Sequence, residues 1–138
     1  MHTNRIPSLS PGYTLVELAM TLLVIGLLAS MAASSYRDGL IKTRRSEAQA
    51  SLTQLQLQQE RWRAVNPSYA DASELGLAQQ SRDGRYEWSV PVANATSYVL
   101  RATATSIGAQ NQDHQGPIDC KVLEVDQSGQ HHPNDCWR

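Results

Sequence analysis

Two cysteines near the C-terminus offer the chemistry that is easiest to state. Cys120 and Cys136 enclose residues 121–135, and two kinds of site are open to them. A disulfide would form in an oxidising compartment, and closing a loop of this size is worth roughly 3 kcal/mol in the chain-entropy model. A zinc site would combine the cysteines with His131 and His132, but zinc ligands usually come in close pairs such as C-x2-C. The wide spacing therefore favours the disulfide.

Glu17 is a carboxylate at the beginning of an otherwise apolar stretch. An ionised acid costs about 2.5 to 3.5 kcal/mol at the centre of a bilayer, so acids in spanning helices tend to be functional. Glu17 lies near one end of the stretch, however, and a side chain in that position can simply reach the lipid headgroups. Its position leaves both interpretations open.

Three histidines in the second half of the chain are further candidates: His114, His131 and His132. They occur in polar stretches rich in glycine, proline and asparagine, where a histidine is more often solvated than catalytic. No nucleophile motif or glycine-rich phosphate loop accompanies them in the sequence. The sequence therefore predicts no catalytic residue, no enzyme activity, no cofactor and no metal site.

The elements that position these residues belong to a chain of 138 residues, which has room for one compact domain. Its net charge of -1 removes the general argument for nucleic-acid binding, which is a large positive field. Although 41% of the residues are hydrophobic, the mean hydropathy is -0.42. Apolar character is therefore concentrated in one place, residues 18–33.

Residues 1–12 form a polar segment with two prolines, which discourage helix formation, and we predict that they are a leader. Residues 13–36 contain one charge, Glu17. As a helix, positions 14–36 cover about 35 Å, enough to cross a bilayer core of about 30 Å. A conventional secretory signal would be cut after the apolar run, and the small residues at 29–33 keep this alternative open.

From residue 37 the helical pattern continues to residue 66 and becomes amphipathic. The apolar side carries Ile41, Ala48, Leu52, Leu55 and Trp62. The opposite side carries Lys42, Arg45, Gln49, Gln56 and Arg63. Asn66-Pro67 ends the pattern because a residue before proline is pushed out of the helical region. We therefore predict one helix of about fifty residues.

Residues 67–83 have the composition of a connecting loop with one helical turn near 72–77, and residues 84–138 change to the two-residue period of strands. Strands are predicted at 85–90, 97–105 and 120–126, followed by a turn and a short last strand. Such spacing favours an antiparallel meander whose apolar face covers the amphipathic part of the helix. Trp88 and Tyr98 lie on apolar faces, so we predict that they are core residues.

The apolar segment begins with Gly12-Tyr13-Thr14-Leu15-Val16-Glu17-Leu18, which resembles the signature of type IV prepilins. That signature combines a glycine, an aromatic residue, an acid at a fixed step and an uninterrupted apolar helix. The resemblance implies the α+β type IV pilin fold: a long N-terminal helix packed on a small antiparallel sheet of three to four strands, with a C-terminal disulfide-bounded loop. It also implies cleavage after Gly12 by prepilin peptidase, N-methylation of Tyr13 and an assembly role for Glu17.

A physical role for Glu17 follows from the implied cleavage. Removal of residues 1–12 leaves a positively charged amine on Tyr13, and the carboxylate of one subunit can pair with the amine of its neighbour inside an apolar filament. Cutting before the apolar helix retains residues 13–36, first as a membrane anchor and later as filament core. Residues 37–138 would form the periplasmic part.

Weaker similarities extend along the rest of the chain. The segments 58–62 and 66–69 and the closing Cys136-Trp137 are similar to PilE-like minor pilins, whereas many secretion pseudopilins lack the cysteine pair. The resemblance therefore implies a minor pilus subunit that enters the filament or primes its assembly, with adhesion, twitching motility or DNA uptake as the filament's uses. Implied partners are major and minor pilins, prepilin peptidase, the inner-membrane assembly platform and membrane lipid. The implied location is the bacterial inner membrane and then the pilus.

Two alternatives stay open: a type II secretion pseudopilin, and a receptor pilin that binds DNA or a surface. A DNA receptor needs a basic stripe. Only two residues of 102–138 are basic, against five acids, which argues against a nucleic-acid partner. Lys42, Arg44 and Arg45 cluster just after the apolar segment, and we predict that they contact lipid headgroups or form a solvated helix face.

Overall fold

The computed structural model describes residues 12–138, except for the side chain of Ser34. The predicted leader, residues 1–12, lies outside the described residues apart from Gly12. The chain forms two compact units that meet after Tyr36. The second unit, residues 37–138, is the head.

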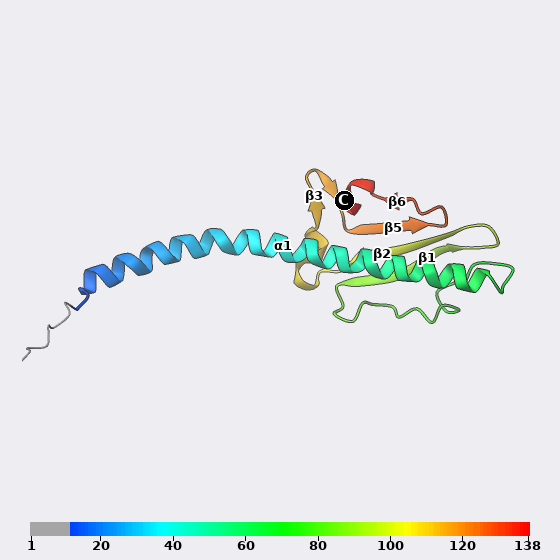
Figure 1. Cartoon of the computed structure of the whole chain (residues 1–138), viewed down its shortest axis with the longest axis horizontal. Helices are drawn as coiled ribbons and strands as arrows, with labels where there is room; N and C mark the ends of the chain where they lie inside the picture. The colour runs from blue at the N-terminus through cyan, green and yellow to red at the C-terminus, as the bar shows by residue number, and fades with distance from the viewer. Residues whose placement is uncertain (1–11) are drawn as a thin grey trace, which may run out of the picture. The chain divides into compact units, whose positions relative to one another are not determined.

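Helix α1, Leu15–Arg63, has 49 residues and contributes to both units (Figure 1). The part of α1 near the N-terminus is long and apolar enough to cross a membrane, and none of that part is buried. The helix ends at Arg63, before the predicted stop at Asn66. The prediction of one long N-terminal helix is confirmed.

Four antiparallel strands form the main sheet of the head, in the order β1-β2-β5-β6. Their bounds are Tyr86–Ala93, Tyr98–Ala104, Val122–Asp126 and His131–His132. This is the predicted meander with an insertion between β2 and β5, so the predicted α+β fold is confirmed. The insertion contains a 3-10 helix and a two-stranded ribbon: η1, Ile107–Gln112, then β3, His114–Gln115, and β4, Ile118–Asp119. A last 3-10 helix, η2, covers Asn134–Trp137.

The core of the head lies between one face of this sheet and the second half of α1 (Figure 1). Along β2 the buried residues alternate with partly buried ones, which is the predicted two-residue period. The largest apolar residues of the core include Leu52, Tyr86, Tyr98, Leu100, Leu123 and Val125. Fully burying an aliphatic side chain of this size stabilises the fold by roughly 1.5 to 3 kcal/mol, so this core can hold the head together in water.

The prediction that the polar side of α1 is solvated is wrong in part. Only 4% of the surface of Arg45 is exposed, and Gln49 and Gln56 are half-buried and donate to backbone carbonyls of the C-terminal segments. These polar side chains can face the sheet because carbonyl and carboxylate acceptors meet them there. The predicted helical turn near 72–77 is a series of hydrogen-bonded turns instead.

Candidate functional site

The residues of the N-terminal motif meet at the first turn of α1. Thr14 caps the helix: its Oγ1 accepts a hydrogen bond from the Glu17 N–H at 3.2 Å, and its carbonyl accepts from the Leu18 N–H at 3.1 Å. Glu17 is therefore the third helical residue, where the positive end of the helix dipole favours a carboxylate. The sequence signal for this cap is a threonine followed three residues later by a glutamate, Thr14 and Glu17.

Apolar side chains after this cap face outward. Tyr13 is 88% exposed and Leu15 is 84% exposed, and exposure stays above one half for every large apolar side chain as far as Met31. Exposed apolar surface of this extent marks a membrane or protein contact. The helical backbone satisfies its own hydrogen bonds, so lipid or other apolar helices can cover this surface.

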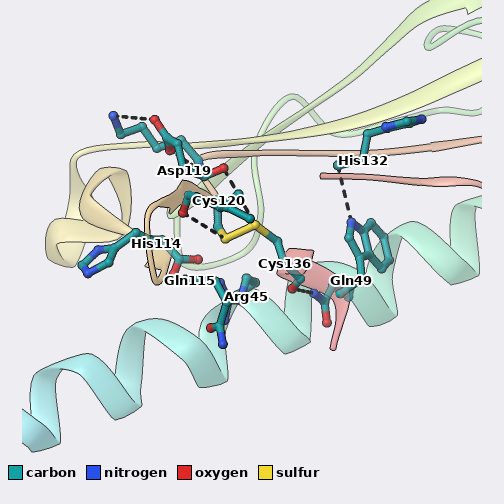
Figure 2. The surroundings of a disulfide bond; sticks show 12 residues. Arg45, Gln49, His114, Gln115, Asp119, Cys120, His132 and Cys136 are labelled. Atoms are coloured by element: carbon teal, nitrogen blue, oxygen red, sulfur yellow. Dashed lines mark hydrogen bonds and ion pairs between the residues drawn. A yellow bond between two sulfur atoms is a disulfide. The ribbon is translucent and has the colours of Figure 1, made fainter. Parts of the chain in front are cut away.

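A disulfide joins Cys120 to Cys136, and both residues are fully buried (Figure 2). The disulfide prediction is confirmed, and the bond leaves no thiolate for the alternative zinc site. The enclosed segment is only partly exposed: Leu123 and Val125 belong to the core, whereas the turn 127–130 is exposed.

The disulfide-bounded segment is attached to α1 by side chains of the helix (Figure 2). The Gln49 side-chain amide donates to the Cys136 carbonyl at 2.7 Å. On the other side of the segment, the rings of His131 and Trp137 stack with centroids 4.0 Å apart, and the Trp137 indole N–H donates to the His132 carbonyl. The Gln49 bond fixes the C-terminus against the helix, and the ring contacts hold Trp137 against β6.

A buried ion pair next to the disulfide connects α1 to the inserted ribbon. An Arg45 guanidinium nitrogen lies 3.3 Å from a carboxylate oxygen of Asp113, and the side chains are 5% and 1% exposed. A second nitrogen of Arg45 donates to the Gln115 side chain at 2.9 Å. Burial raises the pKa of the Asp113 carboxyl, and the positive charge of Arg45 acts in the opposite direction. Sequence reasoning missed the pair because its members are far apart in the chain.

Five of the other ten lysine and arginine side chains of the head are paired as well. Across the sheet, the Arg101 guanidinium lies 2.6 Å from the Glu124 carboxylate. The remaining side chains with a carboxylate within 4 Å are Arg44, Arg85, Lys121 and Arg138. Among residues 12–138, the lysines and arginines without a carboxylate within 4 Å are Arg37, Lys42, Arg61, Arg63 and Arg82.

Known proteins are similar to this chain over most of its length. Residues 34–124 match the family described as type IV minor pilin ComP, DNA uptake sequence receptor. The type IV major pilin protein PilA of Myxococcus xanthus is 29% identical over 110 residues, which are 79% of this chain and 50% of that protein. The fimbrial protein of Neisseria meningitidis is 30% identical over 112 residues, which are 76% and 61% of the two chains.

A third relative is the type IV major pilin protein PilE1 of Neisseria gonorrhoeae, 30% identical over 114 residues, which are 76% of this chain and 64% of that protein. The chain therefore spans between one half and two thirds of the length of these relatives. The long exposed apolar helix, the four-stranded antiparallel sheet and the C-terminal disulfide agree with this match. The chain belongs to the type IV pilin family.

Proposed function

We propose that this chain is a minor subunit of a type IV pilus. The observation that carries the proposal is the exposed apolar helix that Thr14 caps and that has Glu17 in its first turn, in a chain whose head has a core of its own. The matched family is described as a minor pilin, which supports a minor over a major subunit. The three relatives carry pilin or fimbrial names, which supports a pilus over a secretion pseudopilin.

In the proposed sequence of events, prepilin peptidase cuts between Gly12 and Tyr13, and the new amine of Tyr13 is methylated. Residues 13–36 hold the protein in the inner membrane, with the head in the periplasm, until the assembly platform adds the subunit to the filament. There the Glu17 carboxylate pairs with the Tyr13 amine of a neighbouring subunit. Both charges lie in apolar surroundings, so each needs the other.

The proposal is tested by replacing Glu17 with glutamine in cells that assemble the pilus. Glu17→Gln removes the charge attraction while lowering the cost of placing the lone subunit in lipid. We expect normal cleavage and a normal amount of membrane-held protein, but at least a tenfold lower ratio of this subunit in sheared pili to that in the membrane. Losing a charge pairing of about 1.4 kcal/mol already gives a tenfold change.

The matched control is Glu60→Gln, because Glu60 is an exposed acid of the same helix within the head. This change removes the same charge without touching the N-terminal turn, so its ratio should equal that of the unmodified protein. An unchanged ratio for Glu17→Gln would show that this acid only reaches the interface, and the pairing would be abandoned.

A receptor pilin that binds DNA is the second candidate, favoured by one observation. The matched family is described as a DNA uptake sequence receptor. Against it, only two residues of 102–138 are basic, whereas five are acidic. Titration of the full chain in detergent with duplex DNA at several salt concentrations tests whether the chain is a DNA receptor. A receptor would bind with an affinity that falls steeply as salt rises, because phosphate contacts release counterions.

A further inference from the structure

Arginine side chains line a groove of about 510 Å³ in the head. One side of the groove comes from the first turns of α1 in the head, and the other side comes from η1 and from Arg85, the residue before β1. Arg37, Arg44 and Arg85 line it, and Asp38 contributes the one carboxylate of its lining. The apolar side chain of Leu40, 42% exposed, lines it too. A groove with this lining fits a small anion that carries an apolar part.

The three guanidinium groups keep most of their donors free. Arg44 and Arg85 share the Asp83 carboxylate, at 3.8 and 3.0 Å, and Arg44 also pairs with Glu47 at 3.0 Å. Arg37 has no ion pair within the described residues 12–138. A guanidinium has five N–H donors in a planar fork that matches two phosphate oxygens. The groove can therefore offer bidentate contacts to a phosphate group.

The backbone of η1 holds Arg85 in place. Gly108 has a φ of 62°, and a Cβ at this position would clash with the Arg85 guanidinium. Ala109 follows at a φ of 60°, in the left-handed region that costs energy for a residue with a side chain. This close turn of the backbone leaves the guanidinium room at the wall of the groove.

Arg37 follows the exposed apolar segment directly in the sequence. At about 1.5 Å of rise per residue, Arg37 to Arg44 lie within about 12 Å of the last residue of that segment along the helix. When the apolar segment spans a bilayer, this stretch lies at the depth of the lipid headgroups. We propose that the groove binds the phosphate of an anionic lipid such as phosphatidylglycerol before the subunit enters the filament. The inference rests on the membrane-held stage of the proposed function.

The observations favour lipid over DNA as the source of the phosphate. DNA binding needs a line of cations along the head, whereas these cations converge on one groove, and Arg37 directly follows the apolar segment in the sequence. Leu40 gives the glycerol and acyl region of a lipid an apolar contact, which a nucleic-acid backbone does not need.

The test counts lipids that stay bound to the full chain. The protein is purified in neutral detergent, mixed with phosphatidylcholine or phosphatidylglycerol, and examined by native mass spectrometry. We expect phosphatidylglycerol to be retained in preference to phosphatidylcholine. The charge-assisted hydrogen bonds of one arginine to the phosphate contribute roughly a tenfold gain in binding, so the double change Arg37→Gln with Arg44→Gln should weaken phosphatidylglycerol binding roughly 100-fold. Tryptophan fluorescence must confirm that the variant head is folded.

Lys42→Gln is the matched control, because Lys42 is an exposed cation on the same stretch of α1 that does not line the groove. It should change phosphatidylglycerol binding less than twofold. A loss per substitution that is equal in Lys42→Gln and in the double variant would mean diffuse attraction by surface charge and would overturn the site. Binding that the double variant retains in full would overturn it as well.

Two further experiments distinguish lipid from other sources of phosphate, and lipid binding in the groove from membrane binding by the whole chain. If inorganic phosphate or duplex DNA displaces the lipid and binds with the same dependence on Arg37, the lipid assignment is wrong. Flotation with vesicles tests the membrane-held stage by itself. If the unmodified chain does not float, that stage fails and this inference fails with it; if it floats but retains no lipid in the groove, only this inference fails.

Discussion

The apolar half of α1 exposes its apolar side chains, whereas the sheet of the head buries apolar side chains on one face. Every large apolar side chain from Leu15 to Met31 is more than half exposed, whereas Leu100 and Leu123 are 0% exposed. The head folds in water around its own core. The apolar half obtains its helical backbone from local hydrogen bonds but needs lipid or other helices to cover its side chains.

This contrast predicts that substitutions in one region leave the measurements of the other unchanged. Changes at the N-terminal motif should alter processing and incorporation into filaments. Changes at the head core should alter the free energy of unfolding. A substitution that alters both would contradict the separation.

The largest effect is expected from Gly12→Val. A branched side chain at the proposed scissile bond would keep the peptidase from approaching the backbone, which a glycine leaves open. The intact mass of the membrane-held protein should then be that of the uncut chain, with at least tenfold less of the form that starts at Tyr13. The free energy of unfolding of the head should not change. A normal amount of cleaved protein would place the cut elsewhere.

A large loss of head stability is expected from Asp113→Leu, which leaves Arg45 buried without its carboxylate. Removing one partner of a buried ion pair typically costs about 3 to 5 kcal/mol. Urea unfolding of the full chain in detergent, followed by tryptophan fluorescence, measures this loss.

The control for that change is Asp113→Leu combined with Arg45→Met, which replaces both charges by apolar groups. The pair as a whole contributes little, because burial of the carboxylate offsets the attraction. The double variant should therefore recover most of the lost stability. A double variant as unstable as Asp113→Leu would mean that the loss comes from packing.

A somewhat smaller loss is expected when the disulfide is removed by Cys120→Ala with Cys136→Ala. Opening this loop should lower the free energy of unfolding by roughly 3 kcal/mol. Chemical reduction of the unmodified protein should produce a similar loss, because it opens the same loop. Processing at Gly12 should continue at its normal rate. If reduction has no effect, the contacts of Gln49 and Trp137 are sufficient to hold the C-terminus.

The smallest effect concerns how the free energy of unfolding of the head falls at alkaline pH. Burial raises the pKa of Tyr98 to about 12, from an ordinary value near 10. The unfolded chain therefore loses its proton first, so the stability that Tyr98 contributes is complete below pH 10 and disappears as the pH rises through 12. This contribution is on the order of 2 to 3 kcal/mol. Burial also raises the pKa of Tyr86.

Tyr98→Phe should make the unfolding free energy less dependent on pH between 10 and 12, while Tyr86 keeps part of the dependence. Urea unfolding at pH 9, 10, 11 and 12 compares the two slopes. Equal slopes would show that Tyr98 is not protected from solvent in the native head.

Structural features that depend on residues close together in the sequence were predictable. Hydrophobic periodicity predicted the long helix and the strands with Tyr86, Tyr98 and Leu123, because each pattern depends on neighbouring residues. Spacing of the two cysteines favoured their disulfide. The N-terminal motif placed Glu17 near the beginning of the apolar helix, and the capping bond to Thr14 follows from the same residues.

Pairings between distant segments were decided only by the tertiary structure. Periodicity placed Arg45 on a solvated face, because it cannot show that Asp113, far along the chain, supplies a carboxylate at that face. The groove between Arg37 and Arg85 has the same origin, since it depends on the left-handed turn at Gly108. A local pattern determines which residues share one side of a helix or strand, whereas the partners across the core are determined by how the whole chain packs.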